Sequence, residues 1–595
     1  MIRQSLLLFL ILLNPVSSDA KQLPDILPLD QVQPGQTGYG LTVFSGFKIE
    51  RFKVEVIDIV HKFLPKQDII LIRVDHPILR KTGVVGGMSG SPIFLQDKLV
   101  GAVAYGWSFT KEPVCGVTPI QDMLDLMKVE VRGADHAGYA ASEKSRQLSP
   151  QTTMSAMSRR DHLWQSHPLR QNKIPVGDLA PVTVPLNAAG FSPEELEILK
   201  DAFSSYGFEP VLGGGIGRTD GPNNFVPGSA IGIQLVSGDM SMIGTGTVTW
   251  VGPKQLIAFG HPMFNAGELH LPTTTARINH TLSSLARSHK ISSPSREIGS
   301  LIQDRQAGIV VDISERASTI PMVFTIHQGN KEQVFRVQLA RHRLLTPSLA
   351  TAVASAALSQ AIPDVARSTF TTTTRLDVRG YPQMEITEQQ YSGTGTKIVG
   401  AVFSRGLQTI EKILDNEFGP AHIDRIEINM HVTYAKEVVE IKSIRMNTSE
   451  VKPGSLMDLT VSFRPFDGPE FTKVYPLEIP PSMDDSVLVV EVAGGASVPP
   501  EIAPPKTFEQ YLKNLQAGYP ANSLVISLST PTQGLKMQGQ VIQALPPSVI
   551  DSLNTGAKTE FQKVFHTFWR NVFETQRLVI GKSEIRLRVQ NDLER

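Results

Sequence analysis

Short apolar segments separated by Gly, Pro, Lys and Asp dominate the sequence from residue 33 to about residue 105. Runs such as FKVEVIDIV, DIILIRV and KLVGAVAYG are rich in β-branched side chains, which is typical of strands. The following run, TPIQDMLDLMKV, instead has apolar side chains at helical spacing. We therefore expect one antiparallel β-barrel or sandwich that is closed by a short helix.

The charge balance argues against a polyanionic partner. The chain of 595 residues carries 57 basic and 57 acidic side chains, and no run of five like charges occurs. Binding to nucleic acid or to anionic lipid depends on such clusters of charge. Nucleic acid is therefore not an expected partner.

The N-terminus has the pattern of a secretory signal. Arg3 is followed by an apolar run from Leu6 to Leu13 and then by small residues, which predicts a signal peptide over residues 1–20. This run, like every later one, is shorter than the ~20 residues that a membrane-spanning helix needs. We expect no membrane span and an exported protein that is periplasmic, extracellular or associated with the cell envelope. The single cysteine, Cys115, excludes an intrachain disulfide and is expected to be a buried thiol.

A glycine-rich loop, GGMSGSP, interrupts the strands around Ser89. Glycines on both sides of Ser89 allow the backbone to turn so that the N–H groups of Gly87 and Ser89 point into one concavity. Such a pair of donors can stabilise an oxyanion, and loss of one donor typically lowers a rate about 100- to 1000-fold. The alternative is that the loop is only a tight turn. Ser91 is expected to be a structural neighbour.

A histidine far along the chain could serve as the base that a serine nucleophile needs. His261 follows an apolar strand in QLIAFGHPMF and lies between Gly260 and Pro262. Histidine is suited to this role because its unperturbed pKa is near 6.5. The alternative is a strand-end histidine with a structural role only. Glu268 and His270 alternate onto one strand face near His261, but no metal-binding spacing accompanies them, and we expect neither a metal nor a cofactor.

Two segments resemble a known family. The run VDHPILRKTGVVGGMSGSPIFLQDKLVGAVAYG is similar to the core of the SpoIVB-type serine peptidases, which belong to the chymotrypsin-like clan, and LIAFGHPMF is similar to the segment with their catalytic histidine. The resemblance implies that Ser89 is the nucleophile, His261 the general base and Asp75 the orienting acid. Asp75 could equally be a solvated turn residue before Pro77.

The order of the motifs differs from that of the sporulation peptidase, in which the histidine precedes the serine. Here the serine half comes first, as if two barrels were exchanged along the chain. Triads occur in several chain orders, so this order is compatible with catalysis. It leaves open whether Ser89 and His261 meet within one chain or across a homo-oligomer.

The expected fold class is mainly β with some α: a chymotrypsin-like double β-barrel peptidase unit, an immunoglobulin-like β-sandwich and a small α+β C-terminal region. The expected parts are a signal peptide (1–20), a barrel half with the serine motif (25–135), a linker (136–180), a β-rich half with the histidine motif (181–400), the β-sandwich (424–498) and the C-terminal region (499–595).

Two functions follow as hypotheses. The first is a serine endopeptidase of the SpoIVB type that cleaves a protein or peptide through an acyl-enzyme. The second is a non-catalytic exported scaffold or binding protein that retains the peptidase fold. A structure that places Ser89 more than about 7 Å from every histidine, with no dimer to close the gap, would favour the second over the first.

Overall fold

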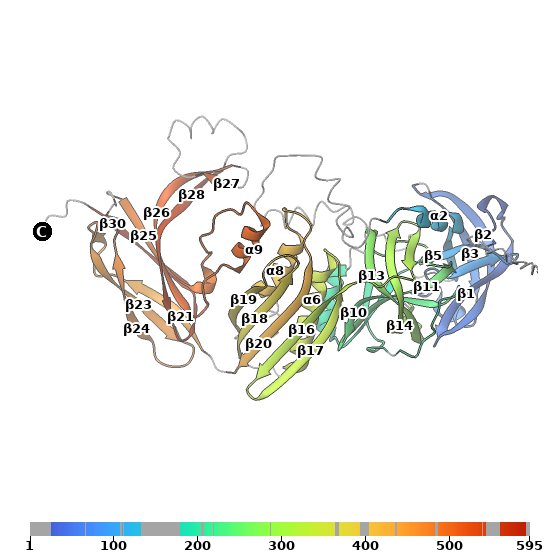
Figure 1. Cartoon of the computed structure of the whole chain (residues 1–595), viewed down its shortest axis with the longest axis horizontal. Helices are drawn as coiled ribbons and strands as arrows, with labels where there is room; N and C mark the ends of the chain where they lie inside the picture. The colour runs from blue at the N-terminus through green and yellow to red at the C-terminus, as the bar shows by residue number, and fades with distance from the viewer. Residues whose placement is uncertain are drawn as a thin grey trace, which may run out of the picture.

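The computed structural model describes residues 25–131, 179–392, 404–542 and 560–590, except for short gaps at 66, 108–109, 111, 204–207, 218, 286, 363–367, 435–436, 482, 484–485 and 538–539. The described parts form an elongated row, with the N-terminal barrel at one end and the C-terminal sheets at the other (Figure 1). The predicted signal peptide and nearly all of the predicted linker lie outside the described residues.

The N-terminal unit is a closed antiparallel barrel. Its strand order is β4-β1-β2-β3-β6-β5, and the pairing of β4 with β5 closes the ring. Alternate side chains of the strands, such as Val54, Val56, Ile70 and Ile72, are buried inside. The elements are β1 (Thr37–Ser45), β2 (Lys48–Leu64), β3 (Gln67–Asp75), α1 (Leu79–Thr82), β4 (Pro92–Leu95), β5 (Lys98–Gly106), β6 (Val114–Pro119) and α2 (Ile120–Asp125), the last of which is the predicted short helix.

A second closed barrel follows. Its strand order is β10-β13-β14-β15-β12-β11, with β10 and β11 paired to close it, and all neighbours are antiparallel. The strands are β10 (Ala230–Gly238), β11 (Ser241–Val251), β12 (Gln255–Ala258), β13 (Gly267–Leu282), β14 (His289–Arg305) and β15 (Gly308–Asp312). The predicted double β-barrel is confirmed.

The two barrels share a buried contact. Leu99, Ile120 and Met123 of the first barrel form one apolar cluster with side chains of the second, including Ile257 and Val310. Each such side chain contributes about 1.5–3 kcal/mol when it is removed from water. The loops that carry Ser89 and His261 are therefore fixed against each other by a common core.

The sheet of the second barrel extends into the middle of the molecule (Figure 1). There α6 packs against β16, β17, α5 and α8 and is almost entirely buried. The elements are β8 (Val184–Ala189), α5 (Pro193–Phe203), β9 (Phe208–Leu212), β16 (Thr319–Gln328), β17 (Lys331–Ala340), α6 (Leu345–Ala361), β18 (Ser368–Val378), β19 (Met384–Ser392), α8 (Arg405–Leu414) and β20 (Ile423–Thr433).

The C-terminal part consists of two sheets around one apolar core, with strand orders β24-β23-β21-β29 and β22-β30-β25-β26-β27, and β28 paired to β26. The elements are β21 (Val438–Arg445), β22 (Glu450–Val451), β23 (Leu456–Pro465), β24 (Phe471–Glu478), β25 (Ser486–Gly494), α9 (Phe508–Gln516), β26 (Ser523–Met537), β27 (Gln540–Ile542), β28 (Glu560–Glu574), β29 (Leu578–Ile580) and β30 (Lys582–Val589).

These sheets do not follow the predicted division at residue 498. Strands from the last hundred residues complete both sheets, because β29 pairs with β21 and both β26 and β30 pair with β25. Conversely, β20 belongs to the middle sheet. The immunoglobulin-like topology stays a prediction. Among the helices of the described ranges, none combines the length and the apolar character that crossing a membrane requires.

Candidate active site

The Ser89 loop connects α1 to β4 and depends on two glycines. Gly87 and Gly90 have φ angles of +94° and +91°, in the left-handed region that favours glycine. A Cβ atom on Gly90 would lie 1.9 Å from the carbonyl oxygen of Thr247, so the two barrels touch here without room for a side chain. Ser89 itself is fully buried.

Two amide N–H groups in the Ser89 loop have no acceptor among the residues that the structure describes. The carbonyl of Gly86 accepts from the N–H of Lys290 at 3.0 Å, and the carbonyl of Met88 accepts from the N–H of Ser91 at 2.9 Å. In a trans peptide the N–H points away from the carbonyl, so these bonds fix the directions of the N–H groups of Gly87 and Ser89. Within the described residues neither N–H donates a hydrogen bond. Both predicted oxyanion donors are therefore available.

Residues of the second barrel hold the Ser89 loop by hydrogen bonds to the carbonyl groups of the loop. The N–H of Thr247 donates to the carbonyl of Ser89 at 2.7 Å, and the hydroxyl of Thr249 donates to the carbonyl of Gly90 at 2.8 Å. The fully buried Nζ of Lys290 donates to the carbonyl of Gly87 at 3.1 Å and to the hydroxyl of Thr42 at 2.8 Å. Burial lowers the pKa of Lys290 to about 7.

His261 meets Ser89 within one chain. Its Nε2 atom lies 2.8 Å from the Ser89 hydroxyl oxygen, although 172 positions separate the two residues. Its Nδ1 atom lies 2.8 Å from the carbonyl oxygen of Pro262. Because a carbonyl oxygen only accepts, Nδ1 carries the proton and Nε2 is left as the acceptor that faces the serine. The arrangement can move the hydroxyl proton of Ser89 to His261.

Burial sets the protonation state of the imidazole. His261 is only 2% exposed, and desolvation lowers its pKa to about 4, against contacts with the carbonyl groups of Pro262 and Val182 that raise it. The imidazole is therefore neutral at pH 7, as a general base must be. The Ser89 hydroxyl has a second acceptor, the carbonyl oxygen of Val182 at 3.2 Å.

The structure does not bring Asp75 to His261. The carboxylate of Asp75 lies at the end of β3, is partly exposed, and accepts from Nε and Nη2 of Arg80 at 2.6 and 2.9 Å. These hydrogen bonds lower the pKa of Asp75. The expectation that Asp75 orients the imidazole is corrected: the Pro262 carbonyl occupies that place because the chain turns directly after His261.

A buried carboxylate that the motifs did not reveal supports the histidine loop. Asp304, on β14, accepts from the N–H groups of Met263, Phe264 and Ala266 at 2.7, 2.5 and 3.4 Å. Burial raises the pKa of Asp304 to about 6, although these bonds oppose the shift. Its sequence context, SLIQDRQAG, places it between Gln303 and Arg305 and gives no local signal of burial. Asp304 fixes the backbone that follows His261.

Cys115, Glu268 and His270 are the other reactive side chains that the sequence singled out. Cys115 is buried, as predicted, and its pKa is raised to about 12. The described ranges hold no group of three His, Cys, Asp or Glu side chains placed to bind a metal. Glu268 and His270 are buried on β13, and Nδ1 of His270 lies 4.0 Å from a carboxylate oxygen of Glu315.

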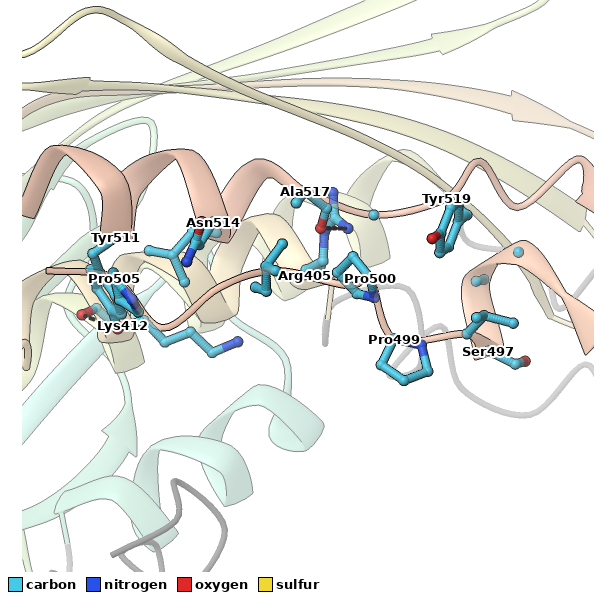
Figure 2. A pocket seen from close by; sticks show the side chains of 16 residues that line it. Arg405, Lys412, Ser497, Pro499, Pro500, Pro505, Tyr511, Asn514, Ala517 and Tyr519 are labelled. Atoms are coloured by element: carbon cyan, nitrogen blue, oxygen red, sulfur yellow. Dashed lines mark hydrogen bonds between the residues drawn. The ribbon is translucent and has the colours of Figure 1, made fainter. Parts of the chain in front are cut away.

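A cavity of about 500 Å³ lies elsewhere, beside α8 and α9. Figure 2 shows Tyr511 and Asn514 on one side of it and Pro499 and Pro500 on the other. Arg405 at its wall donates to the carbonyls of Gln516 and Ala517 at the end of α9. Neither Ser89 nor His261 contributes to its lining.

Two closed antiparallel barrels with a serine and a histidine hydrogen-bonded where they meet define a chymotrypsin-like double-barrel unit. Residues 14–124 match the family model described as SpoIVB peptidase S55, which confirms the resemblance for the segment that contains Ser89. The match covers less than a fifth of the chain and ends before His261. No curated protein and no solved structure matches the chain.

Proposed function

We propose that this protein is a serine endopeptidase of the SpoIVB type that cleaves a protein or peptide substrate through an acyl-enzyme. The observation that carries the proposal is the 2.8 Å contact between Nε2 of His261 and the hydroxyl of Ser89, with Nδ1 held by a carbonyl. The family match of residues 14–124 supports the same reaction class.

The reaction follows from the geometry of the pair. His261 takes the hydroxyl proton as the oxygen of Ser89 bonds to the carbonyl carbon of the substrate. His261 then gives that proton to the leaving amine as the peptide bond breaks and the acyl-enzyme forms. A water molecule, activated by the same imidazole, releases the acid product and restores Ser89.

The N–H groups of Gly87 and Ser89, which donate to no acceptor in the described part of the chain, are suited to the negative oxygen of the tetrahedral intermediate. Donors that are fixed in place before the reaction need no reorganisation, and each is worth about 100- to 1000-fold in rate. The bonds from Lys290 and Ser91 to the neighbouring carbonyls fix these donors.

A large distance between Ser89 and every histidine would have favoured the scaffold hypothesis. The contact of 2.8 Å with His261 argues against that hypothesis, as does the neutral imidazole. The signal-peptide pattern over residues 1–20 supports export as part of the proposal.

A fluorophosphonate reagent tests the proposal, because it labels activated serines irreversibly and accumulates even on a site that opens rarely. We expect one adduct, mapped by mass spectrometry to Ser89, and none in Ser89→Ala. Ser91→Ala is the matched control: its hydroxyl is buried two positions away without a hydrogen bond in the described structure, and it should label like the parent. An equal yield of adduct in Ser89→Ala would refute the proposal.

A further inference from the structure

A short extended segment of the chain lies on β5 beside Ser89. β7 (Ala180–Pro181) pairs antiparallel with the end of β5, opposite Gly106 and Tyr105. The next residue, Val182, donates its N–H to the carbonyl of Ala104 at 2.8 Å. This is the way in which an extended peptide adds to the edge of a sheet.

The segment brings a peptide carbonyl to the catalytic pair. The carbonyl oxygen of Val182 lies 3.2 Å from the hydroxyl oxygen of Ser89 and also contacts the imidazole of His261. In a substrate, the carbonyl carbon must come within about 3–3.5 Å of the nucleophile. In Val182 the carbonyl oxygen faces the hydroxyl instead, so this residue lies where the acyl-side residue of a substrate would bind, but its carbonyl is not placed for attack.

The Val182 side chain fills a matching apolar space. It is 7% exposed and belongs to the core cluster of the first barrel. A Cβ atom on Gly106 would lie 3.5 Å from its Cγ2 atom, an ordinary van der Waals distance, so Val182 packs directly beside Gly106. On the other side of Ser89, the carbonyl of Thr183 passes 3.0 Å from the Cβ position of Gly86.

The contact blocks Ser89 rather than preparing it for attack. The single hydroxyl proton of Ser89 faces the oxygen of Val182, which competes with Nε2 of His261 for it. Within the described residues, the N–H groups of Gly87 and Ser89 donate no bond to that oxygen. Ser89 and His261 are meanwhile shielded from solvent.

We propose that residues 180–183 are a built-in inhibitor that fills the substrate groove along β5, and that this groove takes extended peptides with a small aliphatic residue on the acyl side of the cleaved bond. The inference rests on the proposed function. The segment is tethered to β8, so it competes at high effective concentration, and an external peptide binds only when it lifts away.

The rate of fluorophosphonate labelling at Ser89 tests the blocking role. Val182→Pro removes the N–H that binds Ala104, and Val182→Asp puts a carboxylate into the apolar space. Both should label about 10-fold faster than the parent or more, because the blocked state loses population. Asp312→Asn changes a carboxylate on β15 that binds Ser314 and leaves residues 180–183 intact, and it should label at the rate of the parent. Circular dichroism establishes that each variant is folded.

The unaltered sequence provides a second measurement. Hydrogen exchange at the Val182 amide should quicken once Ser89 carries the phosphonate, because the adduct displaces the segment. Three results would each overturn the blocking role: unchanged hydrogen exchange at Val182, labelling of both Val182 variants at the rate of the parent, or a cut between Val182 and Thr183 in the purified parent. In those cases Ser89 still labels, whereas failure of the proposed function leaves Ser89 unlabelled in every variant.

Peptide substrates test the groove. Acetyl-Leu-Ala-Pro-X-aminomethylcoumarin, with X as Val, Phe or Lys, is offered to Val182→Pro. We expect kcat/KM for X as Val to exceed the others about 10-fold or more, because a charged or large side chain is poorly suited to the apolar space that Val182 fills. Faster cleavage of the Lys or Phe peptide would overturn the assignment of the groove.

Discussion

The Nδ1 atom of His261 lies 2.8 Å from the main-chain carbonyl oxygen of Pro262, the residue that directly follows it. A carbonyl selects the same imidazole tautomer as the carboxylate of a triad does, but it has only a partial charge. It therefore stabilises the charged imidazolium less, and burial lowers the pKa of His261 to about 4. The candidate site is a Ser89–His261 pair oriented by the backbone.

The first prediction concerns pH. The base works only when it is neutral, so labelling of Ser89 should rise with pH through a midpoint near 4 rather than near 6.5. The labelling rate constant is measured from pH 3.5 to 8. A further rise of the labelling rate near pH 6 that is absent in Asp304→Asn would be due to the titration of Asp304, whose pKa is about 6. A midpoint of 6 to 7 in both proteins would contradict the assignment to His261.

The second prediction concerns Asp75. Asp75→Asn weakens an exposed pair with Arg80 and leaves the Pro262 contact untouched. The labelling rate should change by no more than about 2- to 3-fold. An essential orienting acid would instead give a drop of about 10⁴-fold, and that result would restore Asp75 to the site.

The third prediction concerns Asp304, a positioning residue. Asp304→Asn turns one acceptor oxygen into an NH₂ group that faces N–H donors of the Met263–Ala266 backbone. We expect the free energy of unfolding to fall by about 1–3 kcal/mol, and the labelling rate to fall about 10- to 100-fold as His261 moves.

The comparison for Asp304 is Asp312→Asn, which alters a more exposed carboxylate on β15 that binds Ser314. It should keep the parent labelling rate. The account of Asp304 fails if its variant labels as fast as the parent while both proteins are folded.

The fourth prediction concerns Gly90. Gly90→Ala forces a Cβ atom to within 1.9 Å of the Thr247 carbonyl, at a φ of +91°. Overpacking of this kind costs about 1–3 kcal/mol, and it should separate the barrels enough to abolish labelling. Gly46→Ala is the matched control, since Gly46 has a φ of +61° and nothing within 4 Å of its Cβ position. Equal thermal midpoints for both variants would show that the contact at Gly90 is unimportant.

Local patterns predicted the elements well, because burial on one face leaves a period in the sequence. The strands of the first barrel and the helix α2 were both predicted in this way. The C-terminal boundary was not, since β29 and β30 pair with strands about 100 or more positions earlier and local patterns do not encode the partner.

The candidate site was predictable only where side-chain chemistry marked it. Ser89 and His261 carried motifs, whereas the group that orients His261 is a backbone carbonyl, which no residue type signals. The sequence likewise did not indicate that Asp75 pairs with Arg80, which lies five residues further along the chain. Asp304 gains its role only from the fold, which brings its strand beside the histidine loop.

The role of His261 as the general base is tested most directly by the second-order rate constant for fluorophosphonate labelling of Ser89 in the parent and in His261→Ala, each also measured with Val182→Pro. We expect removal of the imidazole to lower this rate constant about 10²- to 10⁴-fold in both backgrounds. Equal rate constants with and without His261 would contradict this role.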